Sequence, residues 1–138
     1  GLNPAKYLPA NADVLYPAWD KSKYKGGAKE YNRLEKAEKI DIPCARRSAS
    51  WGLFQIMGFN HALCGFPLLA DFVAAMYVSE AEQLRAALAF IRSAGLMAAL
   101  KAKDWPKFAK GYNGSGYAQN QYDQRLAEEY AKAKKKGG

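Results

Sequence analysis

The feature that most restricts the fold of this chain is a series of helical signals that continues from about residue 28 almost to the C-terminus. Apolar residues recur at spacings of three and four, and they are clearest in residues 67–77, where one predicted helix face holds Leu68, Leu69, Phe72, Val73 and Met76. After residue 26, no segment of useful length alternates with the period of a strand. The sequence therefore predicts a mainly α fold.

Local start and stop signals divide this region into separate helices. Pro43 suits the first turn of a helix, and Ser79 with Glu82 forms a capping box for a helix that ends near Gly95. Asp104 is expected to cap a further helix. The expected helices are 28–40 on the surface, 43–49, 67–77, 79–95, 96–103, one after Asp104, and a last one from Tyr117 or Gln119 to about Lys134.

Residues 1–26 have a different composition, rich in Pro, Asn, Gly and Tyr. Pro4, Pro9, Pro17 and the pair Gly26-Gly27 interrupt every potential helix, so we expect an irregular loop or a short hairpin. A chain of 138 residues with 49% hydrophobic residues suits one domain. We therefore expect a single domain over 1–138, with a loop-rich part (1–26) and a helical part (27–135).

Charge and cysteine content narrow the function only in part. The net charge of +8 favours a polyanionic partner, and nucleic acid, acidic lipid and bacterial cell wall all qualify. No apolar run approaches the roughly 18 residues that span a bilayer, so we expect no membrane insertion. Cys44 and Cys64 have no further Cys or His pair at metal-ligand spacing, so we predict neither metal nor cofactor. Whether they form a disulfide stays open.

The segment Ala49–Met57 places a polar residue, Gln55, among large apolar ones. A buried amide without partners costs roughly 1 to 3 kcal/mol, so Gln55 should have a local hydrogen-bond partner or line a wet cleft. Residues 48–57 are too apolar for us to expect them on the surface. Gly52 allows close approach to the backbone. A capped core helix with one satisfied amide explains the same residues equally well.

A second segment, Lys110–Tyr117, is expected to be a glycine-rich turn after a helix. It holds Tyr112, Asn113 and Tyr117, and tyrosine rings stack on sugars while amides bind sugar hydroxyls. A glycine helix stop followed by a turn explains the glycines as well. It is not a phosphate-binding loop, because no strand precedes it and the Gly-Lys-Ser/Thr ending is absent.

Taken in order, these segments resemble the N-acetylmuramidase domain of phage endolysins over nearly the whole chain. The likeness rests on Ser50-Trp51-Gly52-Leu53-Phe54-Gln55-Ile56-Met57, Gly58-Phe59-Asn60-His61, Cys64-Gly65-Phe66, Asp104-Trp105 and Gly111-Tyr112-Asn113-Gly114. More distantly, residues 52–55 are similar to the Gly-Leu-Met-Gln segment of goose-type lysozymes and lytic transglycosylases, and residues 112–114 to the transglycosylases' Tyr-Asn-Ala-Gly. The resemblance implies a lysozyme-like helical fold with these segments facing one another across a glycan groove.

The resemblance implies a monomeric peptidoglycan hydrolase that cuts between N-acetylmuramic acid and N-acetylglucosamine, with no nucleic-acid partner. It would act on the bacterial cell wall, in the periplasm or outside, after production in the host cytoplasm if phage-encoded. The residues expected to bind the glycan are Gln55, Tyr112, Asn113, Tyr117, Ser50 and Trp51. A lytic transglycosylase, which returns an anhydro sugar, is an alternative that the product would distinguish. A noncatalytic glycan-binding module or inactive fragment is another.

The general acid of this family is a glutamate in a Phe-Glu-x-His segment, on a helix preceding the region that matches Gly1–Tyr16. The present sequence has no such segment, so the resemblance implies that the first helix and the acid lie upstream of Gly1. Chemistry of this class needs a carboxylic acid of raised pKa beside the scissile bond. Within the chain, Asp13 is the alternative as a carboxylate facing the cleft, and turn capping is its competing interpretation.

The other titratable residues are expected to be structural. Glu30, Glu35 and Glu38 should form solvated ion pairs on a Lys-rich helix, and we expect cap or turn roles for Asp20, Asp71 and Asp104. His61 is expected to make a structural hydrogen bond near a helix end, although it follows the Gln55 segment closely enough to reach the cleft. A helical nucleic-acid binder is opposed by basic residues scattered over every segment and by the lack of a helix-turn-helix motif.

Overall fold

The computed structural model describes residues 4–18 and 20–137. Helices are labelled α, short 3-10 helices η and strands β. The elements in chain order are α1 (Pro4–Asn11), η1 (Lys21–Lys23), α2 (Lys29–Glu38), α3 (Ile42–Ser48), β1 (Ser50–Trp51), β2 (Ile56–Met57), η2 (Gly58–Asn60), α4 (Leu69–Val78), α5 (Glu80–Ser93), α6 (Met97–Ala102), α7 (Trp105–Asn113), η3 (Ser115–Asn120) and α8 (Tyr122–Lys136). The mainly α fold predicted from the sequence is confirmed.

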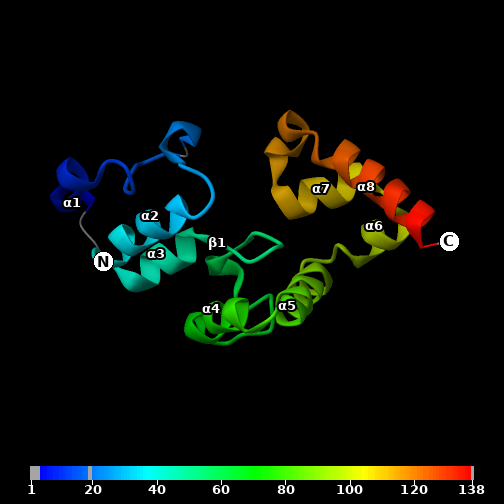
Figure 1. Cartoon of the computed structure of the whole chain (residues 1–138), viewed down its shortest axis with the longest axis horizontal. Helices are drawn as coiled ribbons and strands as arrows, with labels where there is room; N and C mark the ends of the chain where they lie inside the picture. Colours follow the sequence, from blue (N-terminus) through cyan, green and yellow to red (C-terminus); the bar gives the residue numbers. More distant parts are fainter. Residues whose placement is uncertain (1–3, 19, 138) are drawn as a thin grey trace.

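These elements form two lobes on a common base (Figure 1). The N-terminal lobe contains α1, η1, α2 and α3, the base contains the β hairpin, η2, α4 and α5, and the C-terminal lobe contains α6, α7, η3 and α8. Helices α1 and α8 lie on opposite sides of the molecule (Figure 1). The lobes therefore face each other across a space whose floor is the base.

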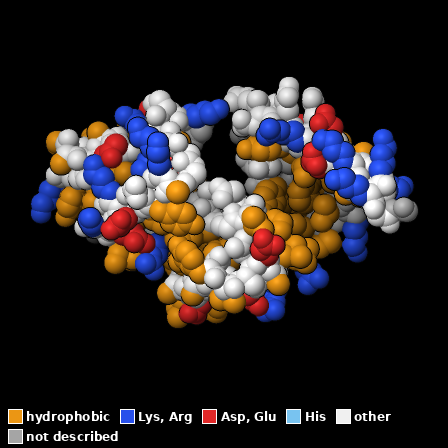
Figure 2. All heavy atoms as spheres, in the orientation of Figure 1, with side chains coloured by type: hydrophobic (Ala, Val, Ile, Leu, Met, Phe, Trp, Pro, Cys, Tyr) orange, Lys and Arg blue, Asp and Glu red, His pale blue; other side chains and the backbone are white. Residues whose placement is uncertain are grey.

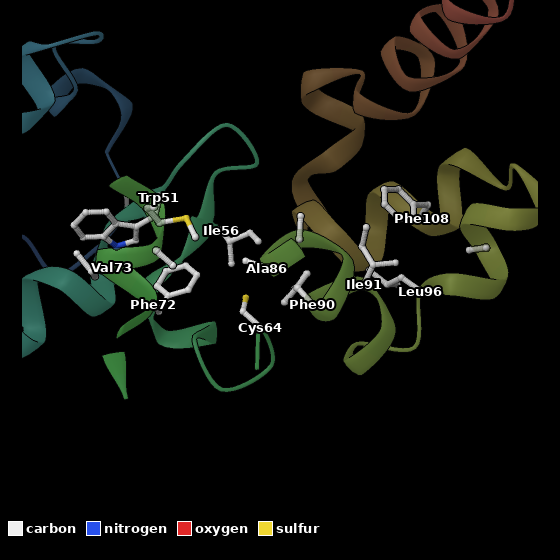
Figure 3. Packing of buried hydrophobic residues seen from close by; sticks show 14 residues of the cluster. Trp51, Ile56, Cys64, Phe72, Val73, Ala86, Phe90, Ile91, Leu96 and Phe108 are labelled. Carbon is white, nitrogen blue, oxygen red and sulfur yellow. The ribbon is translucent and has the colours of Figure 1, made fainter. Parts of the chain in front are cut away.

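One row of buried apolar side chains runs through the base and into the C-terminal lobe. Figure 3 shows this row from Trp51 to Phe108. Phe72 of α4 is fully buried, and Phe66 packs edge-on against it with ring centroids 5.8 Å apart. The buried face of α4 also holds Val73 and Met76, as the spacing of its apolar residues predicted. Burial of this row is the main contribution to the stability of the base.

The helix starts follow the local signals in the sequence. The Ser79 hydroxyl accepts from the backbone N–H of Glu82 at 3.2 Å and opens α5, and the Asp104 carboxylate accepts from the N–H of Lys107 at 3.2 Å and opens α7. Pro43 occupies the first turn of α3. The caps predicted at Ser79 and Asp104 are confirmed. They could be predicted because capping depends only on residues within one turn.

The prediction that no helix forms before residue 26 is wrong, because α1 spans Pro4–Asn11 with Pro9 inside it. A proline in the first turn suits a helix, since the N–H that it lacks has no partner within the helix there. Pro9 removes one backbone bond. At the end of α1, the side-chain amide of Asn11 donates to the carbonyl of Tyr7 at 2.9 Å.

The segment 48–57 forms neither a helix nor a fully buried stretch. Strands β1 and β2 pair antiparallel, with Ser50 opposite Met57 and Trp51 opposite Ile56. Trp51 and Ile56 are buried, whereas the Leu53 side chain is 64% exposed, so the expectation that the segment avoids the surface is wrong in the turn. Two-residue strands are too short to produce an alternating pattern that a sequence can reveal.

The second segment also differs from its prediction. Helix α7 continues to Asn113, so Tyr112 and Asn113 lie in its last turn rather than in the turn that follows. Gly114, with φ +82°, ends the helix, and α8 then begins only at Tyr122. The cysteines form no disulfide: Cys44 is exposed and Cys64 is buried.

Candidate functional site

The space between the lobes contains two neighbouring cavities. Figure 2 shows the molecule hollowed there. The larger cavity, with a volume of about 920 Å³, is bounded by the N-terminal lobe and the base. The smaller one, about 320 Å³, lies against the C-terminal lobe and is lined mainly by apolar side chains, among them Phe54, Phe108 and Tyr112. We call them the large cavity and the small cavity.

The β hairpin separates the two cavities. Its strands hold Trp51 and Ile56 in the core, so the connecting turn, residues 52–55, faces the space between the lobes. Gln55 lines the large cavity, and its neighbour Phe54 lines the small one. The turn is therefore a wall shared by both cavities.

The side chain of Gln55 is held in place by its own hairpin. Its Oε1 accepts from the Ser50 hydroxyl at 2.9 Å, and its Nε2 donates to the Gly52 carbonyl at 2.9 Å. The Gln55 backbone has φ +50°, a left-handed conformation that costs roughly 1 to 2 kcal/mol outside glycine. The expected local hydrogen-bond partners of Gln55 are confirmed. Each end of the amide keeps capacity for one further hydrogen bond.

Gln83 of α5 supports the hairpin turn through a hydrogen bond. The sequence analysis did not identify this residue. Its Oε1 accepts from the Leu53 N–H at 2.8 Å, and its Nε2 donates to the Met76 carbonyl at 2.8 Å. Gly52 has φ +69°, and a Cβ there would lie 3.0 Å from Gln83 Oε1 and 3.0 Å from Met76 Sδ. A larger residue there would be strained by the positive φ and would push against both side chains, so the position favours glycine.

Trp51 and Ser50 occupy different environments, although both were expected to bind the glycan. The Trp51 indole is 6% exposed and donates to the Arg46 carbonyl at 2.9 Å, which ties the hairpin to α3. Ser50 is exposed, lines the large cavity and orients Gln55. Both residues line the large cavity, but Ser50 is exposed there whereas Trp51 is almost fully buried.

Tyr112 joins the second segment to the first. Its hydroxyl donates to the Phe54 carbonyl at 2.9 Å, and its ring stacks on Phe108 with centroids 5.6 Å apart. Burial raises the pKa of Tyr112 to about 12. Asn113 is exposed and lines the small cavity beside Tyr112, whereas Tyr117 lies on η3 and lines neither cavity. Gln55 and Asn113 thus lie near the same hairpin turn, residues 52–55, with Gln55 at the large cavity and Asn113 at the small one.

Asp13 does not have the environment of a general acid. Its carboxylate is exposed and accepts a hydrogen bond from Lys36 Nζ at 2.7 Å, and that bond lowers the pKa of Asp13. A catalytic acid needs the opposite shift. Asp13 is also not among the residues that line the large cavity, although Val14 is.

Several other charged side chains have structural partners. Glu30 pairs with Arg33, and Glu38 pairs with Arg46 at 2.6 Å, which confirms two of the expected ion pairs. Asp20 caps η1 by accepting from the Ser22 N–H at 2.9 Å. No group of three metal-ligating side chains occurs within residues 4–18 and 20–137.

The buried ring of His61 lies 2.7 Å, through Nδ1, from the Phe66 carbonyl. The structural interpretation of His61 is therefore confirmed.

Comparison with known proteins agrees with this geometry. A family model described as N-acetylmuramidase matches residues 2–134. The crystal structure of the Burkholderia AP3 phage endolysin is similar to the chain, with 40% sequence identity and a TM-score of 0.81. The match covers 97% of this chain and 51% of the endolysin, so the chain spans about half of that protein. None of the curated proteins compared with the chain matches it. The chain belongs to the N-acetylmuramidase family.

Proposed function

We propose that this chain forms the glycan-binding part of a muramidase, which cleaves peptidoglycan between N-acetylmuramic acid and N-acetylglucosamine. One observation carries the proposal: in a chain of the N-acetylmuramidase family, the amide of Gln55 is fixed at the wall between two cavities. A fixed amide binds sugar hydroxyl and acetamido groups without losing much conformational freedom. The protein would act as a monomer on the bacterial cell wall.

The polar groups around the turn suit an aminosugar polymer. Gln55 and Ser50 face the large cavity, and the Asn113 amide lies at the small one. The apolar lining of the small cavity suits the methyl group of an acetamido substituent. The net charge of +8 favours association with an acidic wall. Among the described residues, no helix has the length and hydropathy needed to cross a membrane.

The general acid is proposed to be the family's glutamate in a Phe-Glu-x-His segment, which residues 1–138 do not contain. Three carboxylates among the described residues line the large cavity, and the surroundings of each argue against a role as the general acid. Glu30 is paired with Arg33, Asp41 caps α3, and Glu80 is exposed in the first turn of α5. None of them has the apolar surroundings that hold a carboxylic acid protonated.

The test compares this chain with a longer chain that also contains the Phe-Glu-x-His segment. Purified peptidoglycan is the substrate, and released reducing ends are measured. We expect the longer chain to cleave, the 138-residue chain to bind without cleaving, and replacement of the segment's glutamate by glutamine to abolish cleavage. Strong cleavage by the shorter chain would place the acid within residues 1–138.

Product mass separates the remaining alternatives. Water addition gives the hydrolase product, whereas an anhydro sugar identifies a lytic transglycosylase. If the longer chain binds peptidoglycan but releases no product at all, the domain is a noncatalytic glycan-binding module. If neither chain binds, the proposal is wrong.

A further inference from the structure

Four tyrosines from separate segments line the large cavity and have no role in the site described so far. They are Tyr16, Tyr24, Tyr31 and Tyr77. Tyr31 of α2 is 61% exposed and Tyr77 of α4 is 63% exposed, which leaves most of both rings open to solvent. Packing alone does not require such exposure, because an exposed ring adds little to the core.

Tyr77 links this group to the hairpin. Its ring packs against the edge of Trp51, with centroids 6.3 Å apart and planes at 72°. Tyr31 lines the same cavity as Tyr77. Aromatic rings from the hairpin, α4 and α2 thus line one cavity, with Trp51 and Tyr77 in direct contact.

Arg33 positions the other two tyrosines. Its guanidinium lies 4.8 Å from the centroid of the Tyr24 ring, and its NH2 group donates to the Tyr16 hydroxyl at 3.2 Å. The same side chain pairs with Glu30, so its charge is already compensated. We call the surface formed by the four tyrosines and Arg33 the tyrosine wall. Because Arg33 is paired with Glu30, it adds no unpaired cation to this wall that would select an anion.

The tyrosine wall and the proposed glycan site belong to the same cavity, because Ser50 and Gln55 line it too. Its volume of about 920 Å³ is near the upper end of the usual range for small-molecule sites, which leaves room for sugar rings beyond those at the turn. Tyrosine rings present flat apolar faces with a polar hydroxyl at the edge, and they lose little conformational entropy on binding. Pyranose rings have a matching apolar face and polar rim.

We propose that Tyr31 and Tyr77 form a stacking platform for sugar rings of the glycan strand remote from the Gln55 turn, so that long strands bind better than short ones. This inference rests on the proposed function. The ligand is the same aminosugar polymer, and the platform adds contacts that only a strand of several sugars can reach. Tyr24, Arg33 and Tyr16 extend the surface farther into the N-terminal lobe.

The test measures binding of peptide-free glycan strands to the 138-residue chain by titration calorimetry, with a disaccharide and a hexasaccharide as ligands. For the double variant Tyr31→Ala/Tyr77→Ala, we expect hexasaccharide affinity to fall about tenfold and disaccharide affinity to stay unchanged. The double variant Tyr31→Phe/Tyr77→Phe keeps both rings and should bind like the wild type. Tyr130→Ala, on α8 and outside both cavities, is the matched control.

Circular dichroism verifies folding, and the single variants replace the double one if it does not fold. Unchanged hexasaccharide affinity, or equal loss for both ligands, would overturn the platform. If the wild type binds both ligands equally well and the variants match it, the platform is wrong while the proposed function stands. If the wild type binds neither ligand, the proposed function fails first.

Discussion

The base and the N-terminal lobe reach their structures by different means. Among the described residues, every buried side chain belongs to the range Trp51–Ala109, whereas α2 and α3 contain no buried residue. The N-terminal lobe is connected instead by polar contacts, such as Arg33 with Tyr16 and Arg46 with Glu38. The N-terminal side of the large cavity is therefore held by polar contacts, whereas its floor is held by apolar burial.

The largest expected effect tests the floor. Phe72→Ala removes a ring that is 0% exposed, and the lost burial plus the remaining cavity should lower the free energy of unfolding by about 3 to 5 kcal/mol. Denaturant unfolding measures this change. Tyr31→Ala, on the exposed wall, is the control and should change the same quantity by about 0.5 kcal/mol or less. Similar losses at both positions would remove the distinction between base and lobe.

The junction between the two regions should behave like the base. A Cβ at Gly58 would lie 2.0 Å from the Arg46 carbonyl oxygen of α3, so Gly58→Ala must displace backbone. We expect a loss of about 3 kcal/mol in the free energy of unfolding. Gly116→Ala is the matched control, because a Cβ there meets no atom within 4 Å. If Gly58→Ala unfolds at the same denaturant concentration as the control, Gly58 does not pack as closely against α3 as described.

A smaller effect is expected where the base meets the C-terminal lobe. Tyr112→Phe removes the hydroxyl that donates to the Phe54 carbonyl, and we expect a loss of about 1 kcal/mol. The pKa of Tyr112 is raised from 10.0 to about 12, so the folded state holds this proton more tightly than the unfolded state. The contribution of the protonated Tyr112 hydroxyl to the free energy of unfolding is complete below pH 10.0 and is lost as the pH rises towards about 12.

The pH dependence of unfolding separates these two effects of Tyr112. Between pH 10.0 and about 12, wild-type stability should fall more steeply than that of Tyr112→Phe, measured by denaturant unfolding at each pH. Burial also raises the pKa of Cys64, to about 11, but this contribution is common to both proteins. Parallel pH profiles would mean that the Tyr112 hydroxyl is not buried against the hairpin.

The smallest effect on stability is expected at Gln55, together with a large effect on binding. Gln55→Gly relieves the strain of φ +50° but removes two side-chain hydrogen bonds, so the net change in stability should stay within about 1 kcal/mol. Glycan affinity should fall about tenfold, because the fixed amide is lost. Thermal unfolding and calorimetry measure the two quantities. A variant that unfolds, or that binds like the wild type, would make Gln55 a purely structural residue.

Features decided within one helical turn were predictable from the sequence. The caps at Ser79 and Asp104, the start at Pro43 and the buried face of α4 all depend on neighbouring residues. Helix α1 was missed because prolines were treated as complete interruptions, although Pro4 lies where a helix accepts proline. The hairpin was missed because two paired residues per strand leave no period.

The candidate site was predictable only in outline. The resemblance to a family implied that the Gln55 and Tyr112 segments face one another across a groove. The hydrogen bond from Tyr112 to the Phe54 carbonyl shows that they converge, but in direct contact and not across a groove. The support from Gln83 was missed because its partner, Leu53, lies 30 residues away in the chain. The tyrosine wall was missed for the same reason, since its members come from four separate segments.

The most direct test of the account is an NMR titration of the chain with the peptide-free hexasaccharide, followed through backbone amide shifts. The account predicts that the largest shifts occur in residues 50–55 and at Asn113, with smaller ones along the wall formed by Tyr31 and Tyr77. Shifts confined to surfaces outside both cavities, or no shifts at saturating glycan, would contradict the claim that the space between the lobes is the glycan site.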